Sequence, residues 1–540
     1  MSVSLTAPGT GALPTVRRLV LYILLFTLVT LAAVGAAGLL GLLLDPAGST
    51  DDSGRTSELA RSLAFLLVAG PLAMLLWRQL AKRLLDPVES GATAWGLYLA
   101  AMYATSLIVA STGLFSLVGN LAAARTQGWQ PEMATAIIWA GVWWWHYRIW
   151  SDTLRSPRRL PDLPGILASW YAVALGATAT ATALSVLFSA AVDSMFSGFS
   201  LGTPWWRGVL AQLPWIAGGL TLWWWHWHRK RMGAVYGGFA DVALVLMGIL
   251  GAGAATLGGT GYLLYGLGRS VIHGASAQLL APVPLSLAVA LTGAVIFNRA
   301  WAELASRAAA TSRAGALVVS GLGLAAGASG LGVCINALLA ALTRPLAGNR
   351  GGDLLLAGII WLAIGALVWV WAWRPGSQTD PRGRRVYLVS VFGISAVVAL
   401  VALLFAGFRI IEFFLEPGRP ASGLLDLIRA PLGLLVATVM VSLYHFVVWR
   451  SDRVLLEETE PQGRGSLESL IVVSGGETQE LAAELGKLTH AKVQVMGRPG
   501  DGCQATVEQL LAAIEESGSL APRLMLLVDE PDVIRVIELR

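Results

Sequence analysis

Three histidines occupy similar places in the chain and carry a side chain suited to ligand binding or proton transfer. His146 lies in "WWWHYRIWSD", His226 in "WWWHWHRK" and His445 in "YHFVVWRSD", each near the basic end of an apolar segment. Imidazoles at such positions are able to ligate a haem or to relay protons. The alternative is a ring that packs at the edge of the apolar segment and bonds a carbonyl or a lipid headgroup. A shared site would need histidines from separate helices, because His226 and His228 are two positions apart and face different sides of a helix.

Three charged residues lie inside apolar segments. Asp241 comes early in one segment, and Arg409 and Glu412 come late in another, at a spacing that places both on one helix face. Charged side chains within membrane segments mark ion or substrate pathways by default. The alternatives are an ion pair near the outer edge of the membrane for Arg409 and Glu412, and an Asp241 side chain that reaches the nearby interface.

The stretch "SGGET" at 474–478 follows a predicted strand and precedes a predicted helix. Backbone N–H groups of Ser474, Gly475 and Gly476 could hold a phosphate or another anion there. The stretch lacks both the GxGxxG spacing and a GK[ST] ending, so it predicts neither a dinucleotide site nor a Walker site. A plain strand-to-helix turn is the alternative.

Composition places these residues in an integral membrane protein. The chain has 540 residues, of which 55% are hydrophobic and 13% charged, whereas soluble domains carry about 25% charged residues. A spanning helix needs about 20 apolar residues. About twelve segments qualify, and they lie near 18–44, 60–80, 92–121, 134–150, 165–194, 208–228, 235–267, 282–302, 314–343, 354–374, 385–415 and 428–450.

The even-numbered segments share an ending rich in tryptophan and then in arginine or lysine. The position of His146 recurs at intervals of 68 to 80 residues, which is the signature of a repeat. Its equivalents are Arg78, His226, Asn298, Ala372 and His445. We therefore expect six parallel two-helix repeats in an all-α polytopic membrane protein.

Basic residues gather after the even segments, and the positive-inside rule puts that side in the cytoplasm. We expect both termini in the cytoplasm of a prokaryote, with the chain in its cytoplasmic membrane. Arg17 and Arg18 precede a run too long for a signal peptide, so a retained first helix is expected, with a twin-arginine export signal as the alternative. The net charge of +5 follows from these edges and predicts no nucleic-acid partner.

The chain resembles an uncharacterised prokaryotic membrane-domain family of unknown function that repeats a tryptophan-rich helix pair, often ending in histidine. The resemblance rests on "WWWHYRIWSD", "WWWHWH" and "YHFVVWRSD" and covers roughly residues 16–453. Units one, four and five lack the histidine, which argues against a role that needs all six copies.

The last part of the chain differs, since it alternates predicted strands and helices. We expect a disordered tail at 1–16, a transmembrane domain at 17–453, a linker at 454–465 and a small cytoplasmic α/β domain at 466–540. If its strands are parallel, the loops at 474–478 and 497–503 share the usual ligand side of such sheets.

These patterns favour a non-enzymatic scaffold or sensor in the lipid bilayer, whose last domain binds a protein partner or a small ligand. A transporter or channel is the alternative, and a haem- or quinone-linked redox subunit ranks third. The two cysteines, Cys334 and Cys503, provide no disulfide framework or metal motif. We expect no bound cofactor and no catalytic residue.

Overall fold

The computed structural model describes residues 12–45, 52–196, 204–343, 350–373, 381–415, 422–459, 467–474, 479–489, 491–497, 505–517, 519, 521–530 and 533–539. The chain divides into two compact units, Met1–His445 and Phe446–Arg540. The first unit is helical, and the second contains the sheet.

The helical unit falls into three successive sets of helices. The first set comprises α1 (Ala12–Leu44), α2 (Asp52–Ala64), the π-helix η1 (Phe65–Ala69), α3 (Gly70–Arg83), α4 (Pro87–Ser90), α5 (Thr93–Ala122) and α6 (Trp129–Trp150). The middle set comprises α7 (Leu163–Phe196), α8 (Trp205–Trp224), the π-helix η2 (Trp225–Arg229), the 3₁₀ turn η3 (Met232–Ala234), α9 (Gly238–Ala243), the π-helix η4 (Leu244–Gly251), α10 (Ala252–His273), α11 (Ala277–Leu280) and α12 (Val283–Leu304). The last set comprises α13 (Ala309–Thr343), α14 (Arg350–Ala372), α15 (Pro381–Leu415) and α16 (Ser422–Thr459).

Ten helices among the described residues are long and apolar enough to cross a membrane. Three of these spans combine elements: Gly54–Arg83 joins α2, η1 and α3, Gly238–His273 joins α9, η4 and α10, and Ala277–Leu304 joins α11 and α12. The chain is thus a multi-pass membrane protein. The expected total of about twelve differs by α6 and α8, whose many tryptophans contribute little to hydropathy although the indole ring is largely apolar.

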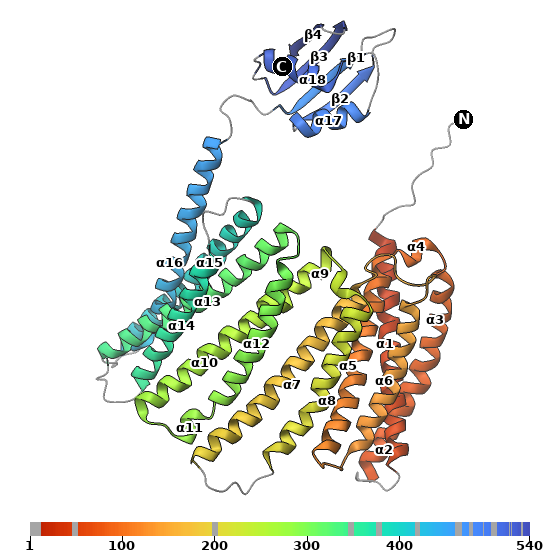
Figure 1. Ribbon diagram of the computed structural model, residues 1–540, viewed down its shortest axis with the longest axis vertical. Helices are drawn as coiled ribbons and strands as arrows, with labels where there is room; N and C mark the ends of the chain where they lie inside the picture. The colour runs from red at the N-terminus through yellow and green to blue at the C-terminus, as the bar shows by residue number, and fades with distance from the viewer. Residues whose placement is uncertain are drawn as a thin grey trace. The chain divides into compact units, whose positions relative to one another are not determined.

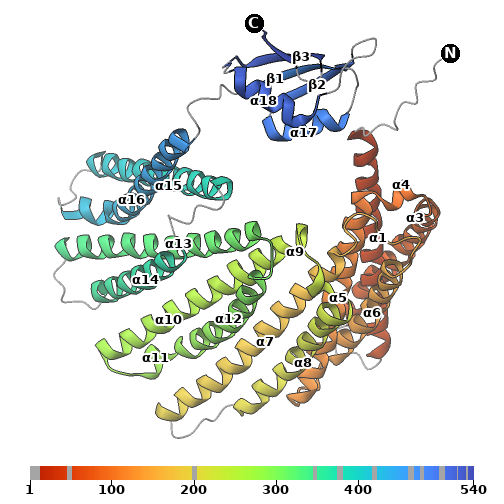
Figure 2. The same cartoon turned by 45° about the horizontal axis from the view of Figure 1, so that its top comes forward.

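Long helices pack both against the next long helix in the sequence and against a helix of an adjacent pair. α5 contacts α6 and α8, α7 contacts α8 and α12, and α10 contacts α12 and α14 (Figure 1; Figure 2). Around α1, α3 and α5 the core is aromatic: Trp95 is fully buried and stacks on Tyr98, at a ring-centroid distance of 5.5 Å. Sequence neighbours thus bury one another's apolar faces.

Glycine permits a close approach between α13 and α14. A Cβ atom added to Gly365 would meet the backbone nitrogen of Gly327. Small residues permit such crossings in membranes, where van der Waals contact rather than hydrophobic burial holds helices together.

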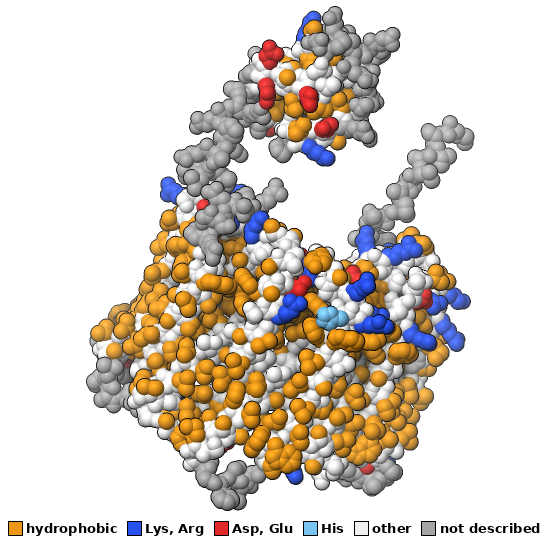
Figure 3. Space-filling model, viewed as in Figure 1, with side chains coloured by type: hydrophobic (Ala, Val, Ile, Leu, Met, Phe, Trp, Pro, Cys, Tyr) orange, Lys and Arg blue, Asp and Glu red, His pale blue; other side chains and the backbone are white. Residues whose placement is uncertain are grey.

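Charge is segregated on the surface of the helical unit. On its visible face, hydrophobic side chains cover most of the area, and Lys and Arg gather along one end (Figure 3). A broad apolar surface with one basic border is the expected exterior of a multi-pass membrane protein.

The second unit has the strand and helix order expected from the sequence. β1 (Ser469–Ser474), β2 (Lys492–Gly497), β3 (Arg523–Glu530) and β4 (Val533–Glu538) form one sheet in the order β2-β1-β3-β4. β1 pairs in parallel with β2 and β3, and β4 pairs antiparallel with β3. Its core joins one sheet face to α17 (Gln479–Thr489) and α18 (Val507–Ser517). α16 continues to Thr459, so residues 454–459 of the expected linker are helical.

Candidate functional site

A cavity of about 420 Å³ lies in the middle set of helices, between α7, α8 and α12. Functional ligand pockets commonly enclose about 300–1,000 Å³. On α7 the lining runs from Ser169 to Leu184, and on α12 from Leu291 to Glu303. Most of the lining is aliphatic or aromatic, so the cavity suits a largely apolar molecule.

Two of the three π-helical segments border this cavity. Trp227 of η2 and Leu244 of η4 both line it. π-Helical turns widen a helix locally and are frequent at functional sites. Their meeting at one cavity singles out this place among the described helices.

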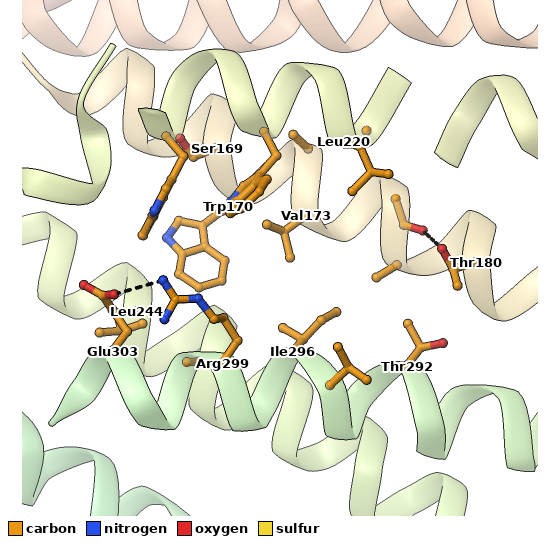
Figure 4. A pocket seen from close by; sticks show the side chains of 18 of the residues that line it. Ser169, Trp170, Val173, Thr180, Leu220, Leu244, Thr292, Ile296, Arg299 and Glu303 are labelled. Atoms are coloured by element: carbon orange, nitrogen blue, oxygen red, sulfur yellow. Dashed lines mark hydrogen bonds and ion pairs between the residues drawn. The ribbon is translucent and has the colours of Figure 1, made fainter. Parts of the chain in front are cut away.

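One end of the cavity is polar. Arg299 and Glu303 lie one helical turn apart on α12 and form an ion pair, with Nη2 and Oε2 3.6 Å apart. The Trp170 indole lies at the same end, and Thr180 and Thr292 lie toward the other end (Figure 4). The cavity therefore combines a long apolar wall with a charged mouth.

Glu303 links this mouth to a buried charge cluster. Its Oε1 lies 3.2 Å from Nη2 of Arg307, whose side chain is only 2% exposed. Arg307 Nη1 donates to the Val235 carbonyl at 2.6 Å and lies 3.2 Å from Asp241 Oδ1. The guanidinium also covers the Tyr236 ring, 4.3 Å from its centroid.

Asp241 is fully engaged in this cluster. Its Oδ1 accepts from the Gly237 N–H at 3.1 Å, and its Oδ2 accepts from the Thr311 hydroxyl at 2.7 Å. The cluster thereby ties the start of α9 to the end of α12 and the start of α13. Asp241 takes part in fastening helices together rather than standing free in an apolar segment.

A second cavity, of about 380 Å³, adjoins the first. The two share walls on α7 and α12, among them Trp170, Ala177 and Thr292. Met247 and Gly251 of η4 line the second cavity. The π-helical segment therefore borders both spaces.

The three histidines are fully buried and share one geometry. In each, Nδ1 lies 2.7–2.8 Å from the carbonyl four residues earlier. Because a carbonyl only accepts, Nδ1 carries the proton and Nε2 is the acceptor. Tyr98 donates to His146 Nε2 at 3.2 Å, and Tyr103 donates to His226 Nε2 at 2.8 Å.

The histidines are not gathered into one site. His146 and His226 each bond a tyrosine of α5, and His445 packs among Trp373, Tyr387 and Tyr444. Within the described residues no group of three metal-binding side chains occurs. Both ring nitrogens of His146 and His226 are occupied, which leaves neither free to ligate a haem iron without breaking a tyrosine bond.

None of the remaining predicted residues that the structure describes lines the cavity. Arg409 and Glu412 of α15 form a local pair, 2.7 Å apart, with side chains 34% and 29% exposed. Ser474 ends β1 and is buried, whereas Gly475 and Gly476 lie outside the described residues. β1 and β2 are adjacent and parallel, and the residues that come after them in the sequence, 475–478 and 498–504, lie outside the described residues.

Sequence reasoning did not select Arg299, Glu303 and Arg307 as a group. Their spacing of four residues was the available signal, because residues four apart on a helix are neighbours. The cavity itself left no local signal, since its walls come from helices distant in sequence.

Comparison with known proteins identifies two regions of the chain. The family model described as Domain of unknown function (DUF5671) matches residues 18–143 and again residues 313–440. The expected resemblance to an uncharacterised membrane-domain family with repeated units is thus confirmed. No curated protein and no solved structure matches the chain.

In the sequence, the two DUF5671 regions lie on either side of the segment that contains the cavity. The first begins in α1 and ends in α6, and the second begins in α13 and ends in α16. Residues 144–312 lie between them and contain the whole middle set of helices. The cavity, η2, η4 and the Arg307 cluster therefore all belong to the segment between the two matched regions.

Proposed function

We propose that this protein is a non-enzymatic membrane sensor or scaffold whose middle helices hold a lipid-like molecule. The observation that carries the proposal is the apolar cavity with one charged end, bordered by two π-helical segments. The helices of the two DUF5671 regions hold the middle helices in place. The α/β unit binds a protein partner or a small ligand and so conveys the state of the membrane helices.

We also propose twelve spans rather than ten. α6 and η2-extended α8 contact α5 and α7, two of the ten candidate spans, which supports membrane placement. Tryptophan prefers the headgroup level, which suits helices that end in tryptophan clusters. With six two-helix repeats, both termini lie on the basic side, which the positive-inside rule assigns to the cytoplasm. The membrane is then the cytoplasmic membrane of a prokaryote.

Native mass spectrometry of the full chain released from detergent tests the cavity's role. We expect the wild-type protein to retain a bound molecule and Ala177→Phe to lose it, because residue 177 lines both cavities. The matched control is Ala191→Phe, an exposed position farther along the same helix. Equal occupancy in Ala177→Phe and wild type would contradict the proposal.

Transport of the same molecule is a second candidate. Two adjoining cavities that share walls on α7 and α12 favour it, since a ligand could pass from one to the other. Movement of a fluorescent lipid between leaflets of proteoliposomes distinguishes the two. Flux that disappears in Ala177→Phe but persists in Ala191→Phe would favour transport, and no flux above that of empty liposomes would favour sensing.

A further inference from the structure

We propose that the cavity's ligand is anionic, with one long apolar chain and a carboxylate or phosphate head bound by Arg299. This inference rests on the proposed function and adds the chemical class of the ligand. It follows from the length of the apolar wall and from the hydrogen-bonding capacity of its charged end.

The apolar wall is long in the direction of the helices. From Ser169 to Leu184 the lining of α7 extends for about 22 Å at 1.5 Å per residue. That is more than half of the hydrocarbon core of a bilayer, which is about 30 Å thick. A chain lying along α7 would fill this space, whereas a compact ring would leave most of it empty.

Arg299 is the exposed cation at the charged end. Its side chain is 64% exposed, and the 3.6 Å contact with Glu303 is longer than a hydrogen bond. A guanidinium carries five N–H donors in a planar fork that matches a carboxylate or a phosphate. No hydrogen bond from this guanidinium to another described residue is found, so its donors face the cavity mouth and solvent.

Glu303 does not cancel the preference of Arg299 for an anionic ligand, because the Glu303 carboxylate lies closer to a different cation, Arg307. Its Oε1 lies 3.2 Å from Arg307, and the Glu303 side chain is only 16% exposed. Arg307 is itself almost fully buried. The Glu303 carboxylate thus faces the buried cluster around Arg307. The Arg299 side chain reaches away from that cluster.

The aromatic side chains of the cavity lining contain N–H donors and no strong acceptors. Trp170, Trp223 and Trp227 line the cavity, and an indole N–H only donates. A head rich in acceptor oxygens matches this set of guanidinium and indole donors. A head group that mainly donates hydrogen bonds, such as an ammonium, would instead be repelled by the positive charge of Arg299.

Photo-cross-linking of the full-length protein in detergent tests the inference. The probes are a diazirine-bearing palmitate, the matching alcohol and the matching monoalkyl phosphate. We expect the palmitate to label peptides of α7 and α12 about fivefold more than the alcohol, the upper range for one partly exposed ion pair. In Arg299→Gln this ratio should fall to about one, while labelling by the alcohol stays unchanged.

Three further variants sharpen the result. Arg299→Lys keeps the charge without the fork and should restore part of the ratio. Glu303→Gln removes the competing carboxylate and should raise palmitate labelling. Arg148→Gln removes an arginine that does not line the cavity and should change nothing.

The outcomes separate this inference from the function on which it rests. Equal labelling by palmitate and alcohol, unaffected by Arg299→Gln, would overturn the anionic head and leave the cavity's role intact. Labelling of α7 and α12 by none of the probes would overturn both. Stronger labelling by the phosphate than by the palmitate would identify a phospholipid-type head, and the reverse would identify a fatty acid.

Discussion

Arg307 forms ion pairs with two carboxylates, those of Asp241 and Glu303, and the Arg307 side chain is only 2% exposed. Replacing it with glutamine would leave Asp241 without its cation in a buried setting. We expect Arg307→Gln to lower the free energy of unfolding by about 3 kcal/mol, as for other broken buried pairs. Thermal unfolding of the detergent-purified protein measures the change.

The matched control for Arg307→Gln is Arg299→Gln, two turns earlier in sequence. Arg299 is 64% exposed, so its loss should cost less than about 1 kcal/mol. A double variant, Asp241→Asn with Arg307→Gln, should be less destabilised than the sum of the two single changes, because each removes the other's partner. Similar losses in Arg307→Gln and Arg299→Gln would contradict a structural role for the cluster.

At the level of residues, the sequence identified Asp241 as unusual but could not supply its partner. Arg307 was visible only as one of many basic residues at the membrane edge. The pairing depends on α9 and the end of α12 lying together, which is a tertiary contact over 66 positions. The histidines show the same limit, since the bonds from Tyr98 and Tyr103 follow from helix packing and not from spacing.

Gly365 shows how one position controls an element. Because an added Cβ would meet the backbone of Gly327, Gly365→Val must push α14 away from α13. We expect destabilisation of about 3 kcal/mol, at the upper end for overpacking. Thermal unfolding in detergent, together with the yield of monodisperse protein, gives the measurement.

Gly393 provides the control for Gly365→Val. It lies within the apolar helix α15, and nothing lies within 4 Å of a Cβ added there. Gly393→Val should therefore leave stability nearly unchanged. If both valine variants are equally stable, close packing of α13 on α14 does not hold the bundle together.

At the level of elements, apolar run length predicted about twelve spans, of which ten are candidate spans among the described residues, and it missed their irregularities. The order of strands and helices in the α/β unit could be predicted from the sequence, because short apolar strands alternate with amphipathic helices. The π-helical segments η2 and η4 were not, because an extra residue in one turn leaves the apolar composition unchanged. These segments border the cavity, so the candidate site depended on the part of the fold that sequence patterns do not encode.

For the whole molecule, the six-unit pattern and the two DUF5671 regions describe the chain at different scales. Each matched region reaches across four long helices, which equals two of the expected helix pairs. The middle set has the same number of long helices but contains the cavity and two π-helical segments. The proposed binding function therefore belongs to the segment between the two regions that the family model matches.

Whether α6 crosses the membrane tests the proposal of twelve spans, because α6 is one of the two helices that separate ten spans from twelve. The loop before α6 contains Gln127 and the loop after it contains Thr153, both exposed. In a background with Cys334 and Cys503 replaced by serine, a membrane-impermeant maleimide should label Gln127→Cys in intact cells. It should label Thr153→Cys only after permeabilisation, because the proposed topology puts that basic loop in the cytoplasm. If α6 does not cross, the two cysteines react alike, and the reverse pattern would place the basic side outside the cell.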